Sequence, residues 1–282
     1  MKQLASLTRR DFLACAMAAM GTVALAGCGS TASSTGASAG SAAASSNDTY
    51  TLVKDGQLTI ASDLANPPLD YTDTSTNQPA GFEVELMQAI GEKLGLTSVY
   101  LSPVKFDTII PTIKQGGTAD VGVSNFTITD ERKQEIDFTD PYLDSNQGLV
   151  TAKTATKTTQ DGLNSADVKV AVQAGTTGES WVQENLPNAT CVSLDDPVVA
   201  LTGVQSGLYD AAVADLPVVK YLVNNSFTDC QVSIEIPTGE QYGIVVSKDN
   251  PALTSAINDA LAQLDEDGTL KDLKTKWFGA DL

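Results

Sequence analysis

VSNFTITDERKQEIDFTDPY, residues 123–142, is the stretch that decides the fold. Apolar residues on both sides of Gly122 predict a buried strand that ends near Ser124. Thr129, followed by two acids, predicts the N-cap and first turn of a short helix that carries Arg132. A guanidinium beside hydroxyl side chains at the end of a strand is suited to a small carboxylate, because it donates two parallel charge-assisted hydrogen bonds.

A second interpretation of Arg132 stays open at this point. Arg132 could instead pair with Asp130 or Glu135 on the surface of its own helix. Such surface ion pairs are common and contribute little to stability. The stretch alone does not separate the two interpretations.

The same order of elements occurs twice along the chain, as strand, helix, strand, helix, strand. The first set is predicted at residues 58–63, 82–94, 98–101, 106–115 and 119–123, and the second at 168–172, 178–186, 189–194, 196–205 and 210–214. Residues 115–121, QGGTADV, also match residues 205–211, QSGLYDA, where a glycine ends a helix before a strand. Chance convergence could produce that match alone. The repeated order predicts two similar α/β lobes with parallel sheets.

Ligands of parallel α/β sheets collect at the carboxyl ends of the strands. In this chain those ends are Asp63, residues 124–127 with Asn125 and Thr127 among them, residues 173–178 and Asp215. Two of the candidate residues also have a purely structural explanation. Asp215 could cap the helix that follows it, and Phe106 could be the first core residue of its helix.

Residues 127–132, TITDER, with residues 136–142, IDFTDPY, resemble the signature of the polar amino-acid family of extracytoplasmic solute-binding proteins, the receptors of ABC importers. The resemblance extends over about residues 57–279. It implies a periplasmic-binding-protein-like fold of type II, with two α/β lobes, a central cleft and two hinge crossings. Lobe 1 would comprise residues 50–141 and 243–282, lobe 2 residues 147–237, and the hinges residues 142–146 and 238–242.

The resemblance also implies roles for individual residues. Arg132 and Thr127 match positions that hold a ligand's α-carboxylate, Thr177 matches a loop whose backbone N–H groups bind the same carboxylate, and Asp215 matches the acid that pairs with the α-ammonium. The positions near the ligand's side chain are Asp63, Asn66, Phe106 and Gln173. Asn66 and Leu69 stand where relatives usually carry aromatic residues, which weakens one stacking surface and favours a polar or small ligand.

Composition and the resemblance together set the expected partners. A net charge of −18 disfavours nucleic acid or anionic lipid, and a chain without histidine disfavours metal sites and histidine-based catalysis. We therefore expect a monomer that binds an amino acid without a cofactor and delivers it to an ABC permease and its ATPase. A ligand sensor and a cyclohexadienyl-dehydratase-like enzyme are the alternatives; no nucleophile–base pair supports the enzyme.

The amino terminus has the features of an export signal. A basic start with Arg9 and Arg10 precedes an apolar run over residues 13–26, and residues 25–28, LAGC, resemble a lipoprotein cleavage box. Residues 1–27 would be removed, Cys28 would carry lipid such as palmitate, and residues 28–49 would form a Ser/Ala/Gly tether at the cell membrane. The twin-arginine and general export routes both remain open, as does an ordinary signal with an incidental cysteine.

Cys191 and Cys230 are the two cysteines of the exported part. An oxidising compartment favours a disulfide between them. The topology implied by the resemblance places them at opposite edges of one sheet, beyond disulfide reach. Both possibilities stay open from the sequence.

Overall fold

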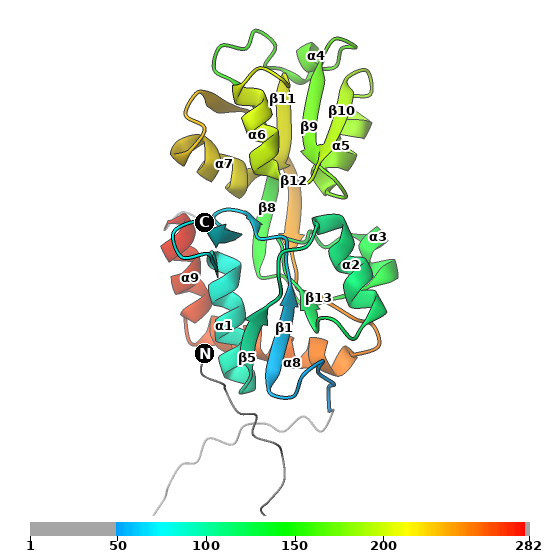
Figure 1. The fold of residues 1–282 in the computed structure, drawn as a ribbon, viewed down its shortest axis with the longest axis vertical. Helices are drawn as coiled ribbons and strands as arrows, with labels where there is room; N and C mark the ends of the chain where they lie inside the picture. Colours follow the sequence, from blue (N-terminus) through cyan, green and yellow to red (C-terminus); the bar gives the residue numbers. More distant parts are fainter. Residues whose placement is uncertain (1–48, 280–282) are drawn as a thin grey trace, which may run out of the picture. The chain divides into compact units, whose positions relative to one another are not determined.

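Two five-stranded sheets, each covered by helices, organise the chain (Figure 1). The computed structural model describes residues 49–279. The predicted export signal, Cys28 and nearly all of the tether lie outside the described residues. The prediction of two similar α/β lobes is confirmed, with one sheet at the heart of each lobe.

Lobe 1 is built on the sheet β5–β1–β6–β13–β7. Its strands are β1 (Gln57–Ala61), β5 (Thr97–Tyr100), β6 (Val121–Gly122), β7 (Asp137–Phe138) and β13 (Val245–Val246). β1 runs parallel to β5 and β6, as predicted, but β13 is antiparallel to β6 and β7. The prediction of a purely parallel sheet is therefore wrong at this edge, because β13 enters lobe 1 on the chain's return from lobe 2.

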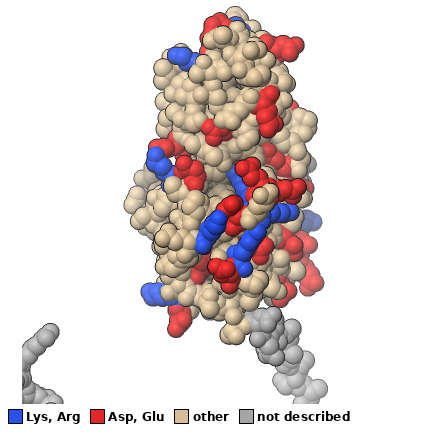
Figure 2. Space-filling view, turned by 90° about the vertical axis from the view of Figure 1, so that its right-hand side faces the viewer, with Lys and Arg blue, Asp and Glu red and all other residues tan. Residues whose placement is uncertain are grey.

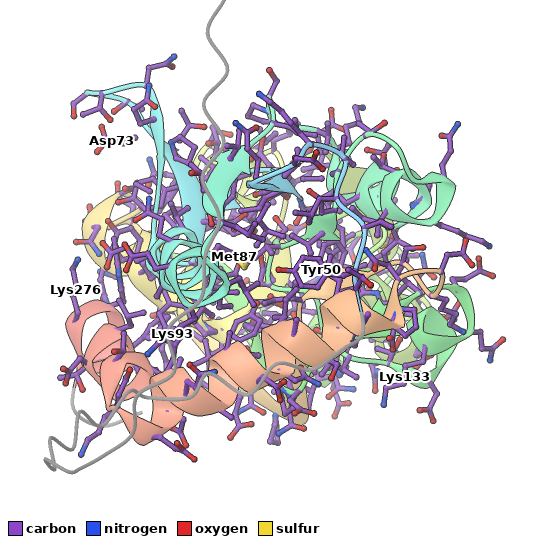
Figure 3. The ribbon with its side chains drawn as sticks, turned by 90° about the horizontal axis from the view of Figure 1, so that it is seen from below. Tyr50, Asp73, Met87, Lys93, Lys133 and Lys276 are labelled. Carbon is purple, nitrogen blue, oxygen red and sulfur yellow. The ribbon has the colours of Figure 1, made fainter. Side chains whose placement is uncertain are left out.

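Helices cover both faces of the lobe 1 sheet. They are α1 (Phe82–Leu94), α2 (Phe106–Gln115), α3 (Asp130–Glu135), α8 (Pro251–Glu266) and α9 (Thr269–Phe278). α1 packs with α8 and α9, whereas α2 packs on β6 and β13. Figure 3 shows lobe 1 from below, with α8 and α9 next to α1. Met87 lies in the interior, and Lys133 and Lys276 lie at the periphery.

The sequence of α1 explains its position and its end. Phe82, Leu86 and Ile90 recur at helical spacing and are fully buried against the sheet. Gly95, with a φ of 70°, ends the helix in the left-handed conformation, and its N–H binds the last carbonyls.

Lobe 2 repeats the plan with the sheet β10–β9–β11–β8–β12. Its elements are β8 (Leu143–Ala152), α4 (Gln160–Leu163), β9 (Lys169–Gln173), α5 (Thr177–Asn185), β10 (Thr190–Leu194), α6 (Pro197–Gln205), β11 (Ala211–Asp215), α7 (Leu216–Asn225) and β12 (Cys230–Tyr242). β9 is parallel to β10 and β11, and β8 is antiparallel to β11 and β12. The central strands β9 and β11 are buried on both faces, which explains their continuous apolar sequences.

The chain passes between the lobes in β8 and β12, which run side by side through the middle of the molecule (Figure 1). Leu143 pairs with Tyr242 at the lobe 1 end of this ribbon. The stretches predicted as hinges, residues 142–146 and 238–242, lie mostly in these paired strand ends rather than in loops. Bending at these residues stays a prediction.

A β-bulge interrupts β12 close to this point. Ile236 pairs with Gln147 and Glu240 with Ser145, so β12 advances four residues while β8 advances two. Pro237 and Gly239 lie in the extra length, and Gly239 adopts a φ of 64°. A bulge of this kind changes the direction in which the following side chains point.

A third, three-stranded sheet was not predicted from the sequence. It consists of β2 (Ala65–Asn66), β3 (Asp70–Asp73) and β4 (Gln78–Ala80), and it leads into α1. Its strands are too short to show a period in the sequence.

Cys191 and Cys230 lie on β10 and β12, at opposite edges of the lobe 2 sheet. Four strand spacings of about 4.8 Å separate those edges, roughly 19 Å. Both cysteines are free. The topology therefore decides the question that the sequence left open, and no disulfide joins them.

Among residues 49–279, none of the helices combines the length and the apolar character needed to span a bilayer.

Gly81, just before α1, has a conformation that only glycine tolerates. Its φ is 126°, and a Cβ there would lie 2.2 Å from the carbonyl oxygen of Leu69. We expect Gly81→Ala to lower the free energy of unfolding by at least about 3 kcal/mol, since strain and a backbone clash add. Gly56→Ala is the matched control, because Gly56 also has a positive φ but open space around it; about 1 kcal/mol is expected there. Urea denaturation measures both, and equal losses would contradict the clash.

Candidate functional site

The carboxyl ends of strands from both lobes meet around one small cavity. Gln173 and Asp215 are the last residues of β9 and β11, and Asn125 and Thr127 follow β6. Eight of the nine predicted site residues line this cavity. The ninth, Asp63, lies behind Asn66, whose side-chain amide donates to the Asp63 carboxylate at 2.8 Å. The structure therefore places all nine of the predicted ligand-binding residues in this cavity or directly behind it.

Arg132 reaches the cavity from α3, whose N-cap is Thr129 as predicted. Its guanidinium donates to the backbone oxygens of Thr127, at 2.8 Å, and of Gly175, at 3.0 Å. It also lies 5.5 Å from the ring centroid of Phe106 and of Phe126. These contacts fix the guanidinium at the boundary between the lobes.

No carboxylate lies within 4.0 Å of Arg132 among residues 49–279. Glu135, one of the alternative partners on its own helix, pairs with Lys114 instead. Burial lowers the pKa of Arg132, and the nearby Asp215 and Glu240 act against that shift. The surface ion pair suggested as the alternative interpretation does not form, and a half-buried cation lines the cavity.

Asp215 faces Arg132's cavity from lobe 2. Its carboxylate accepts hydrogen bonds from the Gln147 amide at 2.6 Å, the Tyr242 hydroxyl at 2.7 Å and the Asn125 amide. Asp215 stands at the N-cap position of α7, as the structural explanation expects, but its side chain makes no capping bond. Burial raises the pKa of Asp215 to about 6, with Glu240 adding to the shift. A cationic group of a ligand would relieve both penalties.

Phe106 has both of the roles considered for it. It is the first residue of α2 and is almost fully buried. Its ring also stacks on Phe126 with centroids 4.5 Å apart and lines the cavity. The cavity therefore has an aromatic surface at Phe106, although it has none at Asn66.

Asp63 belongs to a buried group of carboxyls. The hydroxyl of Ser124 lies 2.6 Å from Asp63 and 2.8 Å from Asp70. A hydroxyl donates one hydrogen, so one of these two contacts needs a proton supplied by an acid. Burial raises the pKa of Asp70 well above its ordinary value, and the charges of Asp63 and Glu83 add to the shift. Burial raises the pKa of Asp63 as well, so this pair of carboxyls supplies the proton that they share through Ser124.

Glu83, on α1, completes this group. Its side chain is fully buried and accepts hydrogen bonds from the backbone N–H of Asn125, at 2.9 Å, and the hydroxyl of Tyr142. Burial raises the pKa of Glu83 to about 7, against the opposing effect of these hydrogen bonds. Glu83 thereby holds Asn125 in its left-handed conformation, with a φ of 42°, at the edge of the cavity.

Contacts across the cavity hold the lobes together. Gln173 donates to Asp63 at 2.7 Å, Asn125 donates to Asp215, and the exposed Lys105 pairs with Asp195 at 2.8 Å. The remaining space is about 20 Å³, which is room for about one water molecule. An amino acid would fit only after the lobes or these side chains move.

Two side chains of the site escaped prediction from the sequence, Gln147 on β8 and Glu240 on β12. One oxygen of the Glu240 carboxylate accepts from Thr127 at 2.9 Å, Gln147 at 3.0 Å and Thr177 at 3.1 Å. A signal for Glu240 was present in the sequence, because proline and glycine inside a strand indicate a bulge that re-aims the next side chain.

Other hollows and patches on the surface do not bring the predicted ligand-binding residues together. A larger hollow of about 820 Å³ lies between α7, α9 and the crossing strands, but none of the predicted site residues lines it. The face that bears α2 and α3 carries basic and acidic side chains side by side (Figure 2). Among residues 49–279, the structure has no cluster of three His, Cys, Asp or Glu side chains suited to a metal ion.

Comparisons with known proteins agree with this geometry. The family profile of bacterial extracellular solute-binding proteins, family 3, matches residues 58–280. The L-cystine-binding protein TcyJ of Escherichia coli K12 is 32% identical over 229 residues, 80% of this chain and 84% of that protein. The structure of an ancestral arginine-binding protein bound to arginine is 34% identical with a TM-score of 0.74, over 79% of this chain and 99% of that one.

A third comparison bears on the enzyme alternative. The ancestral amino acid-binding protein AncCDT-1, described as a precursor of cyclohexadienyl dehydratase, is 35% identical with a TM-score of 0.72, over 79% of this chain and 96% of that one. It too is described as a binding protein. The family and the relatives named here are solute-binding components of transport systems, not enzymes.

Glu83 and Asp215 predict how stability depends on pH. Each is buried with its pKa raised, to about 7 from 4.5 and to about 6 from 3.8. Between its ordinary pKa and its raised pKa, each group keeps a proton in the folded protein that it releases in the unfolded chain. The free energy of unfolding should therefore fall as pH rises from about 5 to 7, by up to about 1.4 kcal/mol per pH unit for each group.

Urea denaturation at pH 5, 6 and 7 measures this dependence. Glu83→Gln should reduce the change between pH 6 and 7, where Asp215, with a pKa of about 6, is already at least half ionised. Glu92→Gln, an exposed change on the same helix, should leave it intact. Stability that rises with pH over this range would contradict the assignment.

Proposed function

Because the chain belongs to the bacterial extracellular solute-binding proteins of family 3, we propose that it is the amino-acid-binding component of an ABC importer. The observation that carries the proposal is Arg132, a partly buried cation that lines the cavity without a carboxylate within 4.0 Å among residues 49–279. A buried charge that lacks its partner is costly unless a ligand supplies that partner.

The ligand's α-carboxylate binds Arg132, Thr127 and the backbone N–H groups of the loop at Thr177, and its α-ammonium binds Asp215. Each charge-assisted hydrogen bond contributes on the order of 1.5–3 kcal/mol net. A few such bonds reach micromolar affinity, about −8 kcal/mol, after the costs of association. Lobe 1 supplies Arg132 and Thr127, and lobe 2 supplies Thr177 and Asp215, so a bound ligand joins the lobes.

The ligand's side chain lies towards Asn66, Gln173 and Asp63, beside the ring of Phe106. Amide and carboxylate groups there favour a side chain that donates hydrogen bonds. Support comes from the relatives, which are named for cystine and arginine. The ligand class we propose is a polar amino acid.

Transport follows from closure of the lobes around the ligand. The strand ends at residues 142–146 and 238–242 act as the hinges, and the closed form docks on a permease driven by its ATPase. The family is extracellular, and the lipidated Cys28 with its tether keeps this chain at the outer face of the membrane as a monomer.

Arg132→Ala should abolish amino-acid binding while the domain stays folded. Thermal unfolding of the domain from residue 47 onward is measured with each of the twenty amino acids. Ligand at a hundred times its dissociation constant stabilises the wild type by about 2.7 kcal/mol, a shift of several degrees. Lys114→Ala removes an exposed positive charge of the same lobe and should keep the shift. Equal shifts in the wild type and Arg132→Ala would refute the role of Arg132.

Cys28→Ser should prevent lipid attachment. Labelled palmitate fed to producing cells should enter the wild-type protein and not the variant, because the thiol is the attachment point. Cys191→Ser provides the control and should label like the wild type. Label retained by Cys28→Ser would show that the anchor lies elsewhere.

A further inference from the structure

Glu240 binds the same two threonines that the proposed function places at the ligand's carboxylate. One of its oxygens accepts from the hydroxyl of Thr127, in lobe 1, at 2.9 Å, and from the hydroxyl of Thr177, in lobe 2, at 3.1 Å. The Gln147 amide donates to the same oxygen at 3.0 Å. One carboxylate oxygen of the chain itself therefore joins the two lobes at this point.

The bulge in β12 explains how Glu240 reaches this position. Between Ile236 and Glu240 the strand gains two residues over β8, and Gly239 adopts a left-handed φ of 64°. The backbone N–H of Gly239 donates to the side chain of Asn146 at 3.0 Å, which fixes the bulge on β8. The direction of Glu240 is therefore built into the backbone.

The two threonines cannot serve two carboxylates at once. Each hydroxyl has one hydrogen to donate, and in this structure both hydroxyls lie within hydrogen-bond distance of Glu240. A ligand carboxylate bound to Thr127 and Thr177 therefore has to displace Glu240. We propose that Glu240 is an internal competitor of the ligand's carboxylate, which holds the lobes together before the ligand arrives and sets the affinity. This inference rests on the proposed function for its ligand.

The structure offers a second position for the Glu240 carboxylate once a ligand displaces it. A second hollow of about 360 Å³ is lined by Glu240, by Thr238 and by Lys133. Lys133 is exposed and has no carboxylate within 4.0 Å among the residues that the structure describes. Figure 3 shows Lys133 at the periphery of lobe 1, on α3. Rotation of the side chain moves the Glu240 carboxylate from the threonines towards this cation.

A different role for Glu240 makes the opposite prediction. Glu240 is close enough to Asp215 to help raise the pKa of that carboxyl. If Glu240 bound the ligand's ammonium together with Asp215, its removal would weaken binding. As a competitor of the ligand, its removal strengthens binding. The sign of the change in affinity separates the two roles.

The test compares Glu240→Ala and Glu240→Gln with Glu235→Ala. Glu235 lies on the same strand, is exposed and pairs with Lys220 outside the cavity, so its removal makes the same change in charge. Calorimetry with the amino acid found to bind the wild type should give a dissociation constant about tenfold lower for Glu240→Ala, the effect of one such hydrogen bond. Glu240→Gln keeps an oxygen acceptor and should gain less. Glu235→Ala should match the wild type.

A background variant shows whether the gain acts through the threonines. In Thr127→Val the hydroxyl is absent, so adding Glu240→Ala should improve affinity by a smaller factor than in the wild type. The same tenfold gain in both backgrounds would mean that Glu240 acts through its charge alone, which would overturn the competition.

Small-angle scattering of the ligand-free protein tests the inference without any ligand. Glu240→Ala should have a larger radius of gyration than the wild type and Glu235→Ala, because a contact between the lobes is lost. If the wild type bound no amino acid, the proposed function would fail, and scattering would still decide whether Glu240 holds the lobes. Weaker binding by Glu240→Ala, or unchanged affinity and scattering, would overturn the inference.

Discussion

The guanidinium of Arg132 is the constraint on which the rest of the site depends. It is half-buried, held by two backbone oxygens and flanked by two aromatic rings, and no carboxylate lies within 4.0 Å of it in the described part of the chain. Backbone dipoles and rings reduce the cost of burying this charge without neutralising it. The protein thereby keeps one strong anion-binding group available where its two lobes meet.

The carboxyl groups of the site complement Arg132, because they supply negative charge where Arg132 supplies positive charge. Asp215 lines the cavity and Glu240 lies beside it, both near enough to act on the pKa of Arg132, and each is held by neutral donors rather than by a cation. Asp63, Asp70 and Glu83 lie deeper and share hydroxyl and backbone donors. This group is stable without full ionisation, because burial favours the protonated form of its acids. A zwitterionic ligand satisfies both halves of the site at once.

Much of the fold follows from local sequence. The bounds of α1 and α2 agree with the predicted helices, because their apolar spacing and terminal glycines are strong signals. The repeated order of elements predicts two lobes, and the rule of strand ends places Asp63 and Asp215 at one site. The antiparallel entry of β13 and the three-stranded sheet could not be predicted, because they depend on how distant segments pair.

The site itself was predicted less completely than the fold. The sequence singles out Arg132. It does not show that Arg132 forms no ion pair with Glu135, because Glu135 pairs instead with Lys114 from another helix. Gln147 and Glu240 contact the lining residues of the cavity from strands that carry the chain between the lobes, and a bulge sets the direction of Glu240. Periodicity assigns faces to a regular strand; it does not give the direction of a side chain beyond a bulge.

The central claim is that Arg132 binds the α-carboxylate of an amino acid, and a matched pair of ligands tests it most directly. Calorimetry compares the best-bound amino acid with its α-carboxamide, which keeps the ammonium and the side chain but lacks the negative charge. The account predicts that the carboxamide binds at least about a hundredfold more weakly, since it loses two charge-assisted hydrogen bonds. Equal affinity for the two compounds would contradict it.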